Sequence, residues 1–74
     1  MSLLRAESHV MLAEANAQDA LDILDRLRAA HPQHVDIARS NLTEALRRVR
    51  VALGAIADAM AAERRQRDEQ DTTD

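Results

Sequence analysis

The chain contains no cysteine, no aromatic residue and no lysine, and it has one glycine and one proline in 74 residues. The absence of cysteine excludes disulfide bonds, zinc–thiolate sites and catalysis by a thiol. The absence of aromatic residues removes the side chains that usually contribute most to cores and interfaces. Because a β fold needs turn residues at every reversal, the scarcity of glycine and proline argues against a β protein.

The apolar content is instead alanine, leucine, valine, isoleucine and methionine, most of which favour helices. A chain of 74 residues forms one domain at most and hides a modest fraction of its surface when it folds alone. Small chains usually gain stability from disulfides, a metal or a partner subunit. We therefore expect an all-α protein that associates with a second copy.

No run of about 18 apolar residues is present, so the sequence predicts no membrane span. The first ten residues, MSLLRAESHV, carry charges where a signal peptide would need an apolar stretch. We expect a cytoplasmic location, in the host cytoplasm if the chain is encoded by a phage. All ten basic residues are arginine and alanine is the commonest residue, a composition typical of GC-rich bacteria and their phages.

Pro32 divides the chain into two helical segments. The residue before a proline is disfavoured in the helical region, whereas proline itself suits the first turn of a helix. We therefore predict a first helix over about residues 3–30, a turn over 31–33 and a second helix over about 33–67.

Three local features complete this outline. Ser2 is the expected N-cap of the first helix. The acidic tail 68–74 (DEQDTTD) has no apolar residue and is predicted to be disordered, which leaves 1–67 as the hairpin. Gly54 lies within the second helix, opposite its seam, and marks either close approach by a partner or a position without a role.

Apolar residues recur at alternating steps of three and four in both predicted helices, which is typical of a coiled-coil seam. The series are Leu3, Ala6, Val10, Ala13, Ala17, Ala20, Leu24 and Leu27, then Val35, Ala38, Leu42, Ala45, Val49, Ala52, Ile56 and Ala59. Folding the chain back near Pro32 brings Ala20 near Ala45, and the residue numbers of such pairs sum to 65. Facing alanines let helix axes approach toward the lower end of the usual ~8–10 Å. The predicted fold is an antiparallel two-helix hairpin with an alanine-rich seam.

Larger aliphatic residues lie beside this predicted seam. At roughly 25 cal/mol per Å² of buried apolar area, alanines cannot hold two helices together alone. The apolar arc of the second helix is also wider than one neighbour covers. A second hairpin packed here would complete a four-helix bundle. The residues assigned to this dimer interface are Leu4, Met11, Leu21, Leu46, Leu53 and Met60.

Four further aliphatic residues lie away from the seam: Leu12, Ile23, Ile37 and Val51. Isolated exposed aliphatic residues are normal on protein surfaces. Alternatively, they belong to a face that binds a partner protein, because recognition of a helix face needs few aliphatic anchors.

The sequence predicts no enzyme, no cofactor and no metal site. His31 and His34 are three residues apart, but Pro32 disrupts helical spacing between them, and a structural or solvent role is favoured. Glu7 and Glu14 could act together only in a cavity, which a tight seam does not provide. We expect these two carboxylates to border the dimer interface or to pair with arginines, namely Arg39 or Arg50.

Arginines of the second helix offer an alternative, nucleic-acid-binding function. Seven arginines against four acidic residues give segment 31–67 a net charge of plus three. The residues concerned are Arg47, Arg48, Arg50, Arg64, Arg65 and Arg67. A solvated face with intrahelical ion pairs, such as Glu44 with Arg48, is the competing interpretation.

The heptad-spaced alanines, over Leu3 to Glu63, resemble the architecture of the Rop family of plasmid RNA-binding dimers. That resemblance implies a dimeric four-helix bundle that binds RNA. The segment MSLLRAESHVMLAEANAQDAL is similar in style to small phage-encoded anti-activators of quorum-sensing transcription factors. This second resemblance implies a hairpin dimer that binds a LuxR-type regulator or a pilus motor ATPase. We therefore expect an inhibitor that sequesters a bacterial protein; the alternative is a Rop-like RNA-binding dimer.

Overall fold

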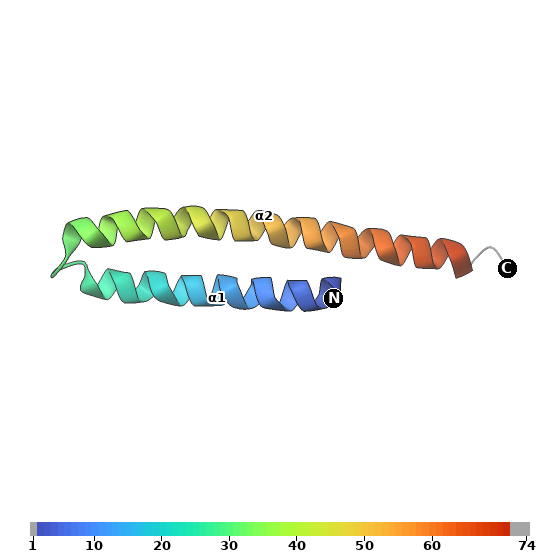
Figure 1. The fold of residues 1–74 in the computed structure, drawn as a ribbon, viewed down its shortest axis with the longest axis horizontal. Helices are drawn as coiled ribbons and strands as arrows, with labels where there is room; N and C mark the ends of the chain where they lie inside the picture. The colour runs from blue at the N-terminus through green and yellow to red at the C-terminus, as the bar shows by residue number, and fades with distance from the viewer. Residues whose placement is uncertain (1, 72–74) are drawn as a thin grey trace.

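The computed structural model describes residues 2–71, and this part of the chain contains two α-helices and no strand (Figure 1). Helix α1 runs from Leu3 to Leu27 and helix α2 from Pro32 to Asp71. The two helices pack side by side in opposite directions, joined by a short turn (Figure 1). The principal extents are 67 × 16 × 15 Å, so the molecule is a long, narrow rod. The predicted all-helical hairpin is confirmed.

Both helices begin where the sequence predicts. Ser2 caps α1, because its Oγ accepts a hydrogen bond of 3.2 Å from the backbone N–H of Arg5. Pro32 is the first residue of α2, where its missing N–H costs no hydrogen bond. The carbonyl of His31 accepts the first helical hydrogen bond, at 3.0 Å from the N–H of Val35.

The first helix ends three residues earlier than predicted, at Leu27 rather than Ala30. The carbonyl of Leu27 accepts hydrogen bonds from the N–H groups of Ala30 (3.2 Å) and His31 (3.1 Å), which close the turn. Both Arg28 Nε (3.2 Å) and Nη2 (2.7 Å) donate to Asp36 Oδ1 across the turn. The pair spans the turn formed by residues 28–30, and because both side chains are more than half exposed, it favours this reversal only weakly.

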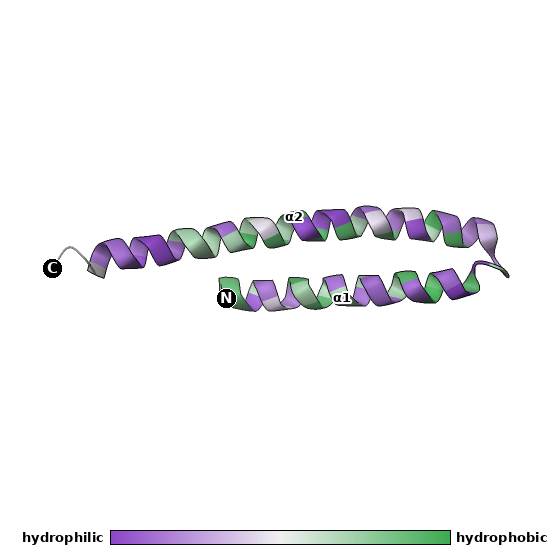
Figure 2. Ribbon diagram, turned by 180° about the vertical axis from the view of Figure 1, so that it is seen from behind, coloured by the Kyte–Doolittle hydropathy of each residue, from purple (hydrophilic) through white to green (hydrophobic). Residues whose placement is uncertain are grey.

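Helix α2 is 40 residues long against 25 for α1, and it continues well past the N-terminus of α1 (Figure 1). This projecting end is hydrophilic (Figure 2). The predicted disorder of the acidic tail is wrong for residues 68–71, which are helical; residues 72–74 lie outside the described residues. Arg64 and Arg65 stand four residues before Asp68 and Glu69, a spacing that favours helix formation by opposite charges.

Interhelical ion pairs report the register of the hairpin. Arg28 pairs with Asp36 at 2.7 Å, and Arg39 Nη1 pairs with Asp25 Oδ1 at 2.9 Å. Arg50 Nε pairs with Glu14 Oε2 at 3.1 Å. The residue numbers in each pair sum to 64, one less than the predicted value of 65. The predicted register is therefore correct to within one residue.

Every second position of the predicted seam is confirmed, whereas the positions between them are wrong by one residue. Ala13, Ala45 and Ala52 are exposed, whereas the residues that follow them turn toward the other helix. The observed seam keeps the three-four spacing and consists of Leu3, Glu7, Val10, Glu14, Ala17, Leu21 and Leu24 in α1 and Val35, Arg39, Leu42, Leu46, Val49, Leu53, Ile56 and Met60 in α2. This shift of every second position brings three leucines and a methionine into the seam, namely Leu21, Leu46, Leu53 and Met60, and so buries more apolar area between the helices. It also brings in the charged residues Glu7, Glu14 and Arg39.

Even so, the hairpin has a very small core. Val35 (3% exposed) and Leu46 (4%) are the two buried hydrophobic residues in the described part of the chain. The other seam residues remain partly exposed, because one neighbouring helix covers less than half of the circumference of a helix. A single hairpin of this kind has little apolar burial to offset the conformational entropy lost on folding.

Gly54 lies in the middle of α2, and a Cβ added to it would meet no atom within 4 Å. The hairpin itself therefore does not require glycine at this position. Replacing Gly54 with alanine is expected to raise the free energy of unfolding by about 1 kcal/mol, because alanine is the better helix former. Urea unfolding followed by circular dichroism measures this gain. A loss of stability would show that another molecule lies against Gly54 in the protein as it exists in solution.

Candidate interaction surfaces

One long side of the hairpin, here named the ionic face, carries the interhelical ion pairs described above. Its acceptors and donors include Asp25, Asp36 and Arg50, each of which directly follows a seam residue. The paired side chains are largely exposed, so they stabilise the fold weakly and chiefly favour one register. The hydrogen bonds and charge of Asp36 raise the pKa of Arg28 above its ordinary value, so this guanidinium stays charged.

The opposite long side, here named the alanine face, consists of the residues that directly precede every second seam position. Because each residue turns a helix by about 100°, residues before and after the seam lie on opposite sides of it. The alanine face comprises Ala6, Ala13, Ala20 and Leu27 of α1 and Ala38, Ala45, Ala52 and Ala59 of α2. None of these eight residues is charged or polar, and none is buried in the hairpin.

The six residues predicted to form a dimer interface do not form one surface in this structure. Leu46 is buried within the hairpin, and Leu21, Leu53 and Met60 are half-buried in its seam. The assignment of Leu46 to a free surface is wrong, because the seam is turned by one residue and the hairpin itself covers this side chain. Leu4 (62% exposed) and Met11 (55%) do remain open to solvent.

The four residues predicted to bind a partner protein are all strongly exposed. The exposed fractions are 59% for Leu12, 53% for Ile23, 64% for Ile37 and 69% for Val51. They are distributed over both helices and do not gather into one patch. Sequence reasoning missed Leu27, which it placed in the seam although 46% of it is exposed.

Three exposed aliphatic residues do lie at one end of the rod. Ile23 and Leu27 are one helical turn apart on α1, just before the turn. Ile37 is at the same level on α2, because Leu27 and Ile37 directly adjoin the ion-paired Arg28 and Asp36. We name Ile23, Leu27 and Ile37 the turn-end aliphatics. That Leu27 of the first helix and Ile37 of the second lie at the same height along the rod follows from the register of the two helices. Heptad spacing within each helix does not predict it.

The arginines of α2 do not form a continuous basic surface. Arg47 Nη2 and Arg48 Nε pair with Glu44 Oε1 at 2.6 and 3.5 Å, and Arg50 pairs with Glu14. The predicted pairs of Glu44 with Arg48 and of Glu14 with Arg50 are thus confirmed. Each of these guanidinium groups already has a carboxylate beside it, which weakens the attraction for phosphate.

Arg64 and Arg67 lie at the other end of the rod, away from the turn. They line a shallow hollow together with apolar residues of both helices, where α2 passes the beginning of α1. The complete lining is Ser2, Leu3, Leu4, Met60, Glu63, Arg64 and Arg67. The mixture of charges in this hollow and along the neighbouring helix does not single out an anionic ligand.

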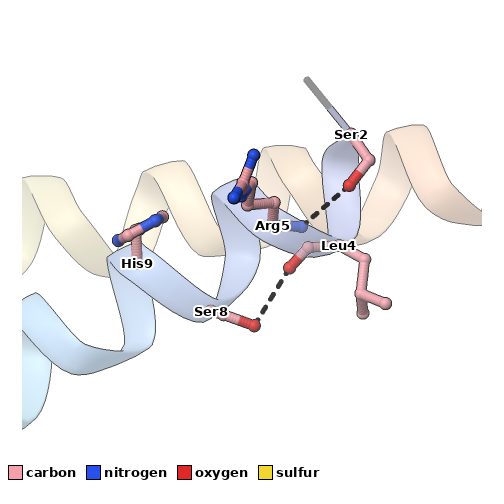
Figure 3. A pocket seen from close by; sticks show the side chains of 5 residues that line it. All are labelled: Ser2, Leu4, Arg5, Ser8 and His9. Atoms are coloured by element: carbon pink, nitrogen blue, oxygen red, sulfur yellow. Dashed lines mark hydrogen bonds between the residues drawn. The ribbon is translucent and has the colours of Figure 1, made fainter.

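A second shallow hollow lies on the first two turns of α1, lined by Ser2, Leu4, Arg5, Ser8 and His9 (Figure 3). The two hydroxyl groups are used locally: Ser2 Oγ accepts from the N–H of Arg5, and Ser8 Oγ donates to the carbonyl of Leu4 at 3.1 Å. Their hydrogen bonds cap and follow the helix, so they do not converge on a point where a reacting atom could sit.

Histidines and carboxylates show no metal-binding arrangement among the described residues, where no group of three or more such side chains could hold an ion. His31 lies in the turn, His34 in the first turn of α2 and His9 near the far end of the rod. Within residues 2–71, neither helix has a segment long and apolar enough to cross a membrane.

The geometry therefore presents an ionic face, an alanine face and a set of turn-end aliphatics. These surfaces are the features from which a function must be argued. Comparison with models of protein families, with characterised proteins and with solved structures gives no significant match for this chain.

Proposed function

We propose that this protein is a homodimeric interaction module that binds and sequesters another protein. The observation that carries this proposal is the imbalance between buried and exposed aliphatic residues. Two hydrophobic residues are buried in the hairpin, whereas seven large ones, from Leu4 to Val51, have 46–69% of their surface exposed. Exposed apolar surface of this extent on a small chain is typical of an association surface.

Dimerisation would complete a four-helix bundle. When two hairpins pack side against side, each helix has two neighbouring helices instead of one. The second neighbour covers apolar side chains that a single hairpin leaves exposed to solvent. The chain has no disulfide to replace such burial, because it contains no cysteine.

Ile23 and Ile37, the two turn-end aliphatics outside the alanine face, are the best candidate for contact with a different protein. They lie at one end of the rod, and charged residues such as Arg28 and Asp36 adjoin them. A small apolar centre with a polar rim is the usual composition of a protein interface. The partner would present an apolar groove or helix with charged side chains around it. The likeness to phage anti-activators suggests a LuxR-type regulator of the bacterial host as this partner.

This proposal predicts that partner binding depends on Ile23 and Ile37. The double variant Ile23→Ser/Ile37→Ser is expected to weaken binding at least about 10-fold, because hot-spot side chains commonly contribute more than about 1.4 kcal/mol. The measurement is capture from a bacterial lysate on immobilised protein, followed by titration of the dominant captured protein.

The matched control is Gln18→Ser/Asn41→Ser, which changes two exposed polar residues on the same two helices. The control should capture the same protein as the original chain does. Equal capture by both double variants would refute the role of the turn end. Capture of RNA in place of protein, abolished by replacing Arg64, Arg65 and Arg67 with glutamine, would support the Rop-like alternative.

A further inference from the structure

We propose that the alanine face is the surface on which a second copy of this chain packs, so that two hairpins join through their alanine faces. This inference rests on the proposed dimerisation and specifies which side of the hairpin is used. It replaces the interface built from Leu46 and its neighbours, because the hairpin itself already covers those side chains.

Charge distinguishes the two long sides of the rod. The ionic face contains Asp25, Asp36 and Arg50, and packing a second hairpin there would remove these groups from water. The eight residues of the alanine face carry no charge, so their burial has no such cost. An association driven by apolar burial therefore uses the alanine face and leaves the ionic face in solvent.

The alanine face also contains more than small residues. Leu27 belongs to it and is 46% exposed, whereas Ile23 and Ile37 are not part of it and stay available to a different protein. Ala13, Ala45 and Ala52 are exposed at the centre of the face. The hairpin thus leaves a continuous apolar surface uncovered along both helices, from Ala6 and Ala59 at one end to Leu27 and Ala38 at the other.

The whole side of the rod that carries the alanine face, with the polar residues at its edges included, has a footprint large enough for a stable dimer. A 25-residue α1 makes the paired part of the rod about 37 Å long, and two helices side by side make it about 20 Å wide. The resulting ~700 Å² per copy is close to the ~800 Å² that each partner buries in an ordinary specific interface.

The seven-residue repeat identifies the partner as a second copy. Alanines every seven residues on both helices form evenly spaced depressions in the surface. Side chains of an opposing surface can fill these depressions when that surface also repeats every seven residues. A second alanine face meets this condition, because a two-fold axis places identical surfaces against each other. Small side chains at these positions also allow the four helix axes to approach closely.

The test is sedimentation of the full chain and of variants that place a long charged side chain on either side of the rod. Ala45→Arg and Ala52→Arg alter exposed positions of the alanine face; Ala15→Arg and Ala57→Arg alter exposed alanines elsewhere and serve as matched controls. All four substitutions keep a good helix former, so circular dichroism should show an intact helix content. The original chain should sediment as a dimer at micromolar concentration.

We expect the two alanine-face variants to raise the dimer dissociation constant at least about 100-fold, because each buries an unpaired charge. The controls should change it less than about 3-fold. A monomeric original chain would refute dimerisation itself, and with it this part of the proposed function. A dimer that Ala57→Arg disrupts and Ala45→Arg does not would refute the choice of face while leaving dimerisation intact.

Because the chain has no cysteine, an introduced thiol gives an independent and milder readout. Ala13→Cys and Ala45→Cys together should form disulfide-linked dimers on oxidation at micromolar concentration, whereas Ala15→Cys with Ala57→Cys should remain largely unlinked. In both pairs the two positions differ by about 10 Å in level along one hairpin, which disfavours a disulfide within one chain. Equal cross-linking of the two pairs would contradict the assignment of the alanine face.

Discussion

Replacing Leu46 with aspartate is expected to unfold the hairpin and to remove most of its helical circular-dichroism signal at room temperature. Leu46 is 4% exposed and is one of the two buried hydrophobic residues in the described chain. The substitution removes its apolar burial and places a carboxylate where no cation is paired with it. The combined loss is at least about 3 kcal/mol. A core of two residues leaves little reserve against a loss of this size.

The matched control is Val51→Asp, five residues farther along the same helix. Val51 is 69% exposed, so an aspartate there stays in water and is expected to change stability by less than about 0.5 kcal/mol. Thermal unfolding of both variants at one protein concentration makes the comparison. A folded Leu46→Asp hairpin that had merely lost self-association would show that Leu46 serves the dimer and not the core.

The three-four spacing of the seam could be predicted from the sequence, whereas the residues at every second seam position could not. Two heptad series run along each helix and share every second position. At the other positions the alanine series has alanines and Leu27, whereas the series here named the leucine series has leucine, methionine, glutamate or arginine. Periodicity alone could not choose between them, because both follow the same three-four spacing. The hairpin chooses the leucine series, because larger side chains bury more area against one neighbour.

Charged residues in the leucine series made the alanine series look like the better seam. The observed seam includes Glu7, Glu14 and Arg39, whereas the alanine series has no charge at any position. Long charged side chains are tolerated at a seam because their stems lie along the apolar surface while the charge reaches its edge. Glu14 does this with Arg50, and Arg39 does it with Asp25.

Local signals predicted the beginnings of the helices better than their ends. Ser2 and Pro32 act through their own backbone or side chain, so their effects are readable at one position. The end of α1 is not marked by a single residue: hydrogen bonds from the N–H groups of Ala30 and His31 to the carbonyl of Leu27 close the turn there. The extension of α2 to residue 71 depends on charge spacing, which a composition argument for the acidic tail overlooked.

The exposed aliphatic residues could also be predicted only in part. Exposure of Leu12, Ile23, Ile37 and Val51 could be predicted, because each lies far from both heptad series. The grouping of Leu27 with Ile23 and Ile37 could not, because it depends on the one-residue turn of the seam and on the early end of α1. A one-residue error around a helix thus moves large side chains between core and surface without changing the fold class.

Ala17 is the one alanine of the observed seam among the described residues, and the register places it opposite Leu46. It lies three residues after Glu14, and Leu46 lies four residues before Arg50, the ion-pair partner of Glu14. We infer that the small side chain of Ala17 leaves the space that the buried Leu46 fills. Ala17→Leu is therefore expected to overpack this level and to lower the free energy of unfolding by about 1–3 kcal/mol.

Exchanging the small side chain at position 17 with the large one at position 46 tests this contact directly. Leu46→Ala leaves a cavity and is expected to cost about 2–5 kcal/mol, whereas the double variant Ala17→Leu/Leu46→Ala restores the total volume. Its cost should fall below the sum of the two single costs by at least about 1 kcal/mol. Urea unfolding in a stabilising osmolyte such as sucrose keeps every variant folded at the start of the titration. Ala15→Leu, at an exposed position of the same helix, should have little effect. Additive costs would mean that Ala17 and Leu46 do not face each other, and the seam would then have to be assigned anew.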